Sequence, residues 1–168
     1  MDRDPKHLKE MLKRSQAHNG TALLEIYQNC NIFNDGAFFA FTDKATKSDT
    51  ALFLQQGEPL VFGAENDKGV LLDGYKPTIV SLKDDQFSKD DLWMHDENDM
   101  FKAQILTRFF DEPNTDNPQY FPRPFGVIYQ AERATYEEQH RKQIELAIER
   151  KGAGDLNGLI RGGSVWEI

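Results

Sequence analysis

The stretch EIYQNCNIFND, residues 25–35, contains Cys30, the only cysteine among the 168 residues of the chain. Residues 21–27, TALLEIY, lead directly into it, and their almost continuous apolar character predicts a short strand covered on both faces, as in parallel sheets. Cys30 follows the predicted carboxyl end of this strand, which is where open parallel sheets bind their ligands. Three amide side chains flank the thiol: Asn29, Asn31 and Asn34.

A helix is predicted immediately before this strand. Asp4 is a favourable N-cap and Pro5 is favoured at the first helical position, and apolar residues then recur at helical spacing. Gly20 suits the left-handed conformation that ends many helices. A helix over residues 5–17, a tight turn and a buried strand together form the end of an α/β unit.

The rest of the chain is predicted to be a mixture of short strands and helices. Turn-forming sequences separate the strands, and a helical turn or two begins after Asp35. The Pro-rich residues 111–125 indicate an irregular loop, and the Gly-rich residues 152–168 indicate a mobile or partner-docked tail. Strands are predicted at 50–54, 59–62, 69–72, 78–82 and 126–130, and helices at 100–110 and 135–151.

The composition argues against several classes of protein. The formal net charge is −8 and the isoelectric point is about 5.0, which disfavours a general nucleic-acid binder because such proteins need clustered Lys and Arg. No stretch reaches the roughly 20 apolar residues of a membrane span. The N-terminus lacks the apolar core of a secretory signal, so a cytoplasmic location is predicted. A single cysteine excludes an intrachain disulfide framework and a four-thiolate site built from this chain alone.

The residues alone leave three interpretations of Cys30. An isolated cysteine is often a small buried hydrophobe. A nucleophile needs a neighbouring base, usually histidine, and no local motif connects Cys30 with any of the four histidines, which are His7, His18, His95 and His140. The third interpretation is a metal ligand, because an amide-rich turn supplies N–H groups that hold a cluster sulfur and raise its potential.

Three further stretches bear on function. WMHDEND, residues 93–99, places a histidine among carboxylates that could bind a divalent cation. The alternative is an acidic helix start, with Asp96, Glu97 and Asp99 near the positive end of the helix dipole. The Gly-rich tail lacks the strand-then-helix context of a nucleotide-binding motif. The Phe-rich residues 38–41 favour a core or a subunit interface.

The sequence around Cys30 resembles a known family. Residues 2–38, DRDPKHLKEMLKRSQAHNGTALLEIYQNCNIFNDGAF, are similar to the middle of the β subunit of 2-oxoacid:ferredoxin oxidoreductases, most of all to the 2-oxoglutarate branch. QNCNIFND followed by Gly-Ala-Phe is the specific part. LWMHDEND at 92–99 and FPRPFGVIY at 121–129 fall where the family has a His-Asp-Glu and a Pro-Gly-Val segment. The resemblance covers residues 2 to about 130 and implies the C-terminal half of that subunit.

The resemblance implies an α/β fold. The expected architecture is the C-terminal end of a thiamine-diphosphate-binding parallel-sheet domain, followed by a small mixed α+β C-terminal region. The implied division assigns residues 1–36 to the end of the thiamine-diphosphate-binding domain and residues 37–130 to the C-terminal domain of the β subunit. Residues 131–168 form a helical and Gly-rich tail.

The resemblance also implies an activity. Members of the family convert a 2-oxoacid and coenzyme A to an acyl-CoA with thiamine diphosphate, Mg²⁺ and a [4Fe-4S] cluster, and they pass electrons to ferredoxin. They work with an α or fused γ/α subunit. Cys30 matches the last cluster ligand of the family, and Asn29, Asn31 and Asn34 could donate hydrogen bonds to cluster sulfurs or to the cofactor.

The sequence departs from the family in what it lacks. The other three cysteine ligands are absent, and so is the Gly-Asp-Gly-Asp stretch that holds Mg²⁺ and the diphosphate. Both are expected outside this chain, so the chain alone is expected to be inactive, and no catalytic residue is assigned within it. The alternatives are a non-catalytic interaction module that docks on a partner subunit through its Phe-rich segment and tail, and a thiol-dependent hydrolase.

Overall fold

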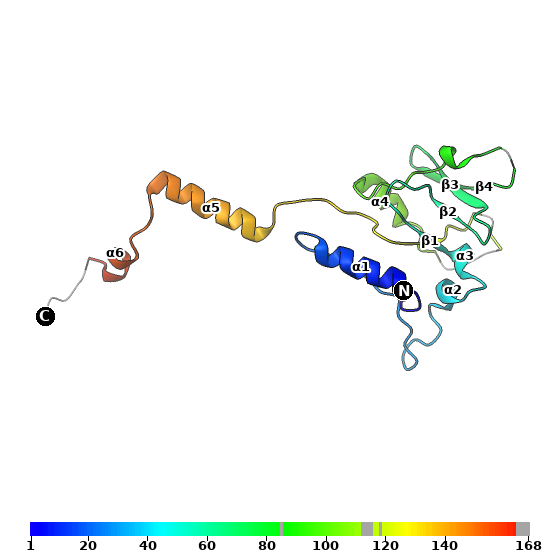
Figure 1. Ribbon diagram of the computed structural model, residues 1–168, viewed down its shortest axis with the longest axis horizontal. Coiled ribbons are helices and arrows are strands. Elements are labelled where there is room, and N and C mark those ends of the chain that lie inside the picture. The colour runs from blue at the N-terminus through cyan, green and yellow to red at the C-terminus, as the bar shows by residue number, and fades with distance from the viewer. Residues whose placement is uncertain (85, 112–115, 118, 164–168) are drawn as a thin grey trace. The chain divides into compact units, whose positions relative to one another are not determined.

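The computed structural model describes residues 1–84, 86–111, 116–117 and 119–163 (Figure 1). Two compact units can be separated, here called the core unit and the tail unit. The core unit contains Met1–His18 and Ala22–Ala131, and the tail unit contains Asn19–Thr21 and Glu132–Ile168. This division does not test the boundary predicted at residue 36, which stays a prediction.

Helix α1 (Pro5–Ala17) begins and ends as its sequence predicts. The Asp4 carboxylate accepts a hydrogen bond from the His7 amide at 3.1 Å, and Pro5 occupies the first turn, where its missing N–H costs nothing. At the other end the His18 amide donates to the Arg14 carbonyl, and Gly20 follows with φ +117°. Helix α1 contributes no fully buried residue, so its inner side only lines the core unit.

The first sheet of the core unit has two parallel strands. Strand β1 (Ala51–Phe53) pairs with β5 (Arg123–Phe125), and Leu52 lies opposite Pro124. Two short helices, α2 (Phe39–Thr42) and α3 (Lys47–Thr50), precede β1 and pack beside it. Proline is accepted in β5 because a strand with one partner has an edge where no amide is needed.

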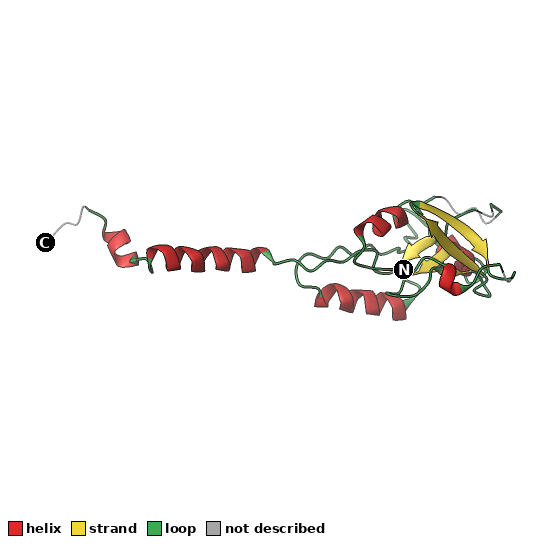
Figure 2. Ribbon diagram, turned by 90° about the horizontal axis from the view of Figure 1, so that it is seen from above, coloured by secondary structure: helices red, strands yellow, loops and turns green. Residues whose placement is uncertain are grey.

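The second sheet is an antiparallel meander of β2 (Val61–Phe62), β3 (Lys68–Asp73) and β4 (Lys76–Ser81), visible as the yellow arrows of Figure 2. A tight turn at Gly74 joins β3 to β4, and Gly74 takes the positive φ of +60° that such turns require. The single-turn helix η1 (Lys89–Asp91) and helix α4 (Met100–Leu106) follow.

The core lies in two clusters. Leu52, Val70 and Leu106 are completely buried in the larger cluster, together with five other residues: Leu54, Leu60, Phe62, Trp93 and Phe109. The smaller cluster contains Met1, Phe41 and Ala51, against which aromatic rings pack. These rings include Tyr27, three residues before Cys30, so the smaller cluster holds the segment that leads to the cysteine.

The tail unit is helical. Thr135 and Glu138 cap each other at the start of α5 (Tyr136–Lys151), and Gly152 ends the helix with φ +79°. Helix α6 (Leu156–Arg161) follows, and neither helix buries a residue. No helix in the described part of the chain is long and apolar enough to cross a membrane.

The predicted α/β class is confirmed, with one parallel and one antiparallel sheet beside the helices. The strands predicted at 50–54, 59–62, 69–72 and 78–82 correspond to β1, β2, β3 and β4. The predicted helices correspond to α1, α4 and α5, although α4 ends at Leu106 rather than at residue 110. The predicted loop at 111–125 and the predicted tail at 152–168 lie partly outside the described residues.

Two strand predictions are wrong. Residues 21–27 are extended but join no sheet among the described residues, and Leu23 is 95% exposed. The segment has the composition of a buried strand without a strand beside it to pair with. The strand predicted at 126–130 lies instead at 123–125. The chain turns at Gly126, which has φ +143°. A Cβ at this position would lie 2.8 Å from the Leu54 carbonyl oxygen, so glycine is needed here.

A candidate metal-ligand loop at Cys30

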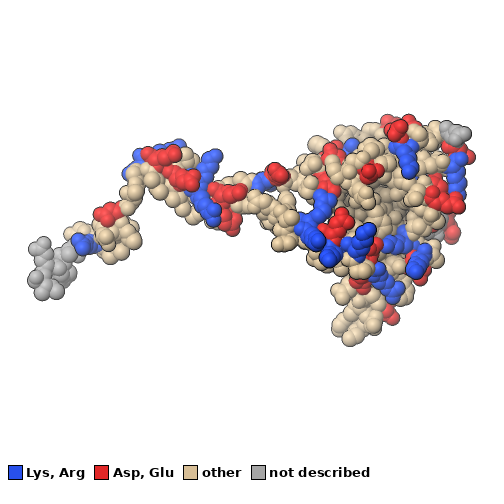
Figure 3. Space-filling model, in the orientation of Figure 1, with Lys and Arg blue, Asp and Glu red and all other residues tan. Residues whose placement is uncertain are grey.

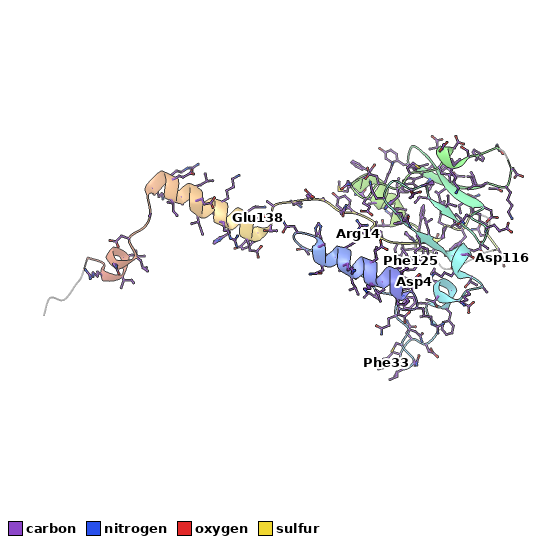
Figure 4. All side chains as sticks on the ribbon, in the orientation of Figure 1. Asp4, Arg14, Phe33, Asp116, Phe125 and Glu138 are labelled. Atoms are coloured by element: carbon purple, nitrogen blue, oxygen red, sulfur yellow. The ribbon has the colours of Figure 1, made fainter. Side chains whose placement is uncertain are left out.

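Cys30 begins a closed turn of the core unit. The Asn34 amide donates to the Cys30 carbonyl at 2.9 Å, and these two residues form an isolated antiparallel bridge. Residues 31–33 form the bend between them. Ile32 is 83% exposed and Phe33 is 89% exposed, so the outer end of the turn is apolar and bare. Figure 4 shows Phe33 at this outer end, away from Phe125 in the sheet.

The turn directs backbone amides at the thiol. The N–H groups of Phe33 and Ile32, and to a smaller extent that of Asn34, lie close enough to the thiol to lower the pKa of Cys30 below its ordinary value. Partial burial and the nearby Asp35 carboxylate oppose this effect. Successive amides that converge on one atom form an anion-binding nest, a feature of many iron–sulfur sites. The turn therefore favours the thiolate, the form of cysteine that binds metals.

The Asn29 side chain closes the base of the turn. Its Nδ2 donates to Asn31 Oδ1 at 2.8 Å and to Asp35 Oδ1 at 2.9 Å, while its Oδ1 accepts from the Gly36 amide at 2.8 Å. The Asn29 amide also donates to the Asp2 carboxylate at 3.1 Å. Asn29 and Asn31 thus bond within the loop, and the Asn34 side chain is exposed beside them. The cofactor contacts predicted for these three residues stay predictions.

The lowered pKa of Cys30 gives a prediction for the purified chain. At a pH between the lowered pKa and the ordinary thiol pKa, more of Cys30 is thiolate in the folded chain than in the unfolded chain. Alkylation by iodoacetamide is therefore expected to be faster than in a peptide of residues 25–35, and its rate should reach half-maximum at a lower pH. Equal pH profiles for chain and peptide would show that the amides do not act on the thiol.

Two carboxylates of WMHDEND, residues 93–99, accept hydrogen bonds from backbone amides close to them in sequence. Asp99 caps α4, accepting from the Phe101 and Lys102 amides at 3.0 Å each. Asp96 accepts from the Asn98 amide. His95 is buried, with Nε2 2.8 Å from the Val127 carbonyl. Of the two interpretations of this stretch, these contacts match the acidic helix start.

Glu97 is the exception in this stretch, because it is completely buried and paired at long range. Arg14 Nη1 donates to Glu97 Oε1 at 2.7 Å, and Nη2 donates to Oε2. The Glu97 backbone is held as well, since its amide donates to Gln56 Oε1 and its carbonyl accepts from the Gln130 amide, each at 2.7 Å. This two-pronged ion pair ties the C-terminal half of α1 to the rest of the core unit.

A second contact holds the Cys30 segment to the same unit. Arg123 Nη1 donates to the Tyr27 hydroxyl at 2.7 Å, and Nη2 donates to the Phe110 and Asp111 carbonyls at 3.0 Å. The Tyr27 ring stacks on Phe38, with ring centroids 4.4 Å apart. These contacts end at Tyr27, so the chain is anchored up to the residues just before the turn and protrudes beyond them.

The donor set fits one ligand of a metal cluster. The described residues contain no group of three or more His, Cys, Asp or Glu side chains that could hold an ion. Within them, the groups that lower the pKa of Cys30 are backbone amides, and no histidine is among the groups that shift it. A nucleophile would therefore lack its base, whereas a single cluster thiolate needs only the amides that are present.

Fold and site define a mixed α/β protein that presents a cysteine with a lowered pKa on a protruding turn. The chain is 30% identical over 172 aligned residues to the 2-oxoglutarate oxidoreductase subunit KorB of Mycobacterium tuberculosis (strain ATCC 25618 / H37Rv). The match covers all of this chain and 44% of that subunit, so the chain spans less than half the length of its relative. The predicted resemblance to a 2-oxoacid oxidoreductase β subunit is confirmed, and the extent of the match is consistent with the predicted half-subunit. No family model and no solved structure matches the sequence.

Proposed function

We propose that the chain is part of the β subunit of a 2-oxoacid:ferredoxin oxidoreductase, with 2-oxoglutarate as the 2-oxoacid. The reaction converts the 2-oxoacid and coenzyme A to an acyl-CoA and CO₂. One proton is released, and two electrons pass one at a time to two ferredoxin molecules. The similarity to a 2-oxoglutarate oxidoreductase subunit supports the general class, and the Cys30 turn supports the place of this chain within it.

Cys30 is the residue that we propose as a ligand of a [4Fe-4S] cluster. The observation that carries this proposal is the closed turn between Cys30 and Asn34, whose backbone amides lie near the thiol and lower the pKa of Cys30. Hydrogen bonds to a cluster sulfur stabilise its negative charge and so raise the reduction potential of the cluster. The chain supplies one thiolate, and the other ligands come from other polypeptide segments because the sequence contains no second cysteine.

The exposed side chains of the turn have a role in the same proposal. Ile32 and Phe33 project beyond the thiol and contact none of the core clusters. Next to a cluster they would exclude water, which lowers the local dielectric and protects the sulfurs from solvent. Asn29 would act as a positioning residue, since it bonds Asn31, Asp35 and Gly36 and so fixes the shape of the turn.

The remaining cofactor and partners belong to the proposal as well. Thiamine diphosphate with Mg²⁺ supplies the carbanion-stabilising chemistry of decarboxylation when it is bound. Its binding residues are proposed to lie outside this chain, together with an α or fused γ/α subunit that helps to bind the 2-oxoacid and coenzyme A. We propose a cytoplasmic location for the enzyme, where ferredoxin is the electron acceptor.

The test uses the assembled enzyme, meaning the complete β subunit together with its partner subunit, reconstituted with iron and sulfide under anaerobic conditions. The expected result is reduction of ferredoxin that requires both 2-oxoglutarate and coenzyme A and that yields succinyl-CoA. Pyruvate serves as the matched control for the 2-oxoacid. Absence of reduction with every 2-oxoacid, in an enzyme loaded with thiamine diphosphate and iron, would disprove the proposed function.

A further inference from the structure

The outer side of α1 carries a row of lysines. Lys6, Lys9 and Lys13 are spaced by three and four residues, so they lie on one face of the helix. All three side chains are exposed, and within the described residues none of them forms an ion pair. We call these three residues the lysine face. Arg3 adds an exposed cation just before the helix, and Glu10 is an exposed carboxylate beside the row.

The charge of this segment is opposite to that of the protein. Residues 1–18 contain five Lys or Arg and three Asp or Glu. The chain as a whole has 20 and 28, which leaves 15 and 25 for the other residues and a formal charge of −10 there against +2 here. Lys and Arg atoms follow α1 in Figure 3. A positive strip on a negative protein orients an approaching partner that carries a negative face.

The lysine face is connected to the Cys30 turn within the core unit. The Asp2 amide donates to the Tyr27 carbonyl at 2.9 Å, and the Asp2 carboxylate accepts from the Asn29 amide at 3.1 Å. The Arg3 guanidinium lies over the Phe39 ring, 5.3 Å from its centroid. The residues just before α1 are thereby held against Tyr27 and Asn29, which precede the thiol, and against Phe39, which follows the turn, so a protein bound at the start of α1 lies near the thiol.

From this arrangement we infer that the lysine face of α1 is the docking surface for a one-electron carrier protein with an acidic face. The inference rests on the proposed function and adds to it the place where the carrier binds. The lysine ammonium groups would pair with carboxylates of the carrier, and Ile32 and Phe33 would form the apolar part of the contact. Exposed charges of this kind act mainly on the rate of association and on its dependence on salt.

The test replaces the lysine face in the assembled enzyme by the triple substitution K6E/K9E/K13E. A matched control carries K44E/K76E/K89E, which changes the charge equally at three exposed lysines elsewhere on the core unit. The probe is a purified acidic ferredoxin, assayed over a range of salt concentrations, with methyl viologen as a small acceptor. Steering by charge is worth about 10- to 1,000-fold in association rate, so kcat/KM for ferredoxin is expected to fall at least ~10-fold at low salt.

Three further measurements distinguish the loss of carrier binding from a general loss of activity. Salt should lower kcat/KM for ferredoxin in the wild type and the control but hardly change it in the triple variant K6E/K9E/K13E. The neutral variant K6Q/K9Q/K13Q should give an intermediate kcat/KM. Reduction of methyl viologen should be the same in all variants, which shows that the variants are folded and that the proposed function stands. Equal ferredoxin kinetics in the triple variant and the control would overturn the inference. A rise in KM for coenzyme A with unchanged ferredoxin kinetics would overturn it as well, and would assign the lysines to coenzyme A.

Discussion

Replacing Cys30 with alanine in the assembled enzyme is expected to remove one thiolate from the cluster and to lower 2-oxoacid-dependent ferredoxin reduction by at least ~100-fold. Loss of a residue that only orients a ligand costs about 10- to 100-fold in metal affinity or activity, and loss of the ligand itself removes more. The measurements are iron content, visible absorbance and the paramagnetic signal of the reduced cluster, together with the rate of ferredoxin reduction.

Two substitutions make this result interpretable. Cys30→Ser keeps the shape of the side chain but offers a hard oxygen in place of a soft sulfur, so it should restore little of the cluster signal. Asn29→Ala leaves the thiol in place and removes the bonds that close the turn, so about a 10-fold loss of cluster retention is expected. Neither Cys30 variant should alter the melting of the chain alone, because Cys30 belongs to neither core cluster. A Cys30→Ala enzyme with normal iron content and absorbance would disprove the ligand assignment.

The comparison of sequence with structure shows where local patterns suffice. Helix α1 could be predicted because Asp4 and Pro5 act within one turn, where the chemistry of the cap is decided by neighbours in sequence. The meander β2–β3–β4 could be predicted because Gly74 and short polar connections separate runs of apolar residues. In each case the interacting groups are only a few residues apart along the chain.

The wrong predictions concern residues whose partners are distant in sequence. The run at 21–27 has the composition of a buried strand, but composition does not state which strand lies beside it. Residues 123–125 were assigned to a loop because they contain proline, yet β5 pairs with a strand 72 residues earlier, and a sheet edge tolerates Pro124. Likewise, Glu97 was predicted to act on a helix dipole, whereas its partner Arg14 is 83 residues away.

The candidate site also has a part that could be predicted from the sequence and a part that could not. Cys30 could be singled out from the sequence because a lone thiol beside three amides is unusual in composition. The amides that act on it could not, since every residue except proline has an N–H and only the folded backbone of residues 31–34 brings three of them near the thiol. The role of Asn29 in closing the turn also depends on these angles. A signal was nevertheless present, since Asn side chains bond the backbone of turns and glycine, here Gly36 with φ +77°, takes the positive φ that turns use.

Arg14→Met is expected to destabilise the core unit by about 3 kcal/mol, because it leaves the Glu97 carboxylate buried without its cation. The Glu97 side chain is 1% exposed, whereas Arg14 is 37% exposed. Glu97→Gln should therefore cost less than Arg14→Met, since the guanidinium left behind can be hydrated. The hydrogen bonds that Arg14 donates to the Glu97 carboxylate raise the pKa of Arg14 further above the working range of pH, so the cation remains charged in the wild type. Urea unfolding followed by circular dichroism gives the free energies.

The double variant Arg14→Met/Glu97→Gln separates a buried ion pair from simple loss of packing. If the pair acts as a unit, the double variant should be more stable than Arg14→Met alone, because no unpaired charge remains. Lys83→Met is the matched control, since Lys83 lies 2.9 Å from Asp67 on the surface and such exposed pairs contribute about 0–1 kcal/mol. Hydrogen exchange should rise in α1 and in the Cys30 turn of Arg14→Met, because Asp2, three residues before α1, accepts the bond from the Asn29 amide. An Arg14→Met chain as stable as the Lys83→Met chain would show that the pair does not hold α1, and with it the Cys30 turn, on the core unit.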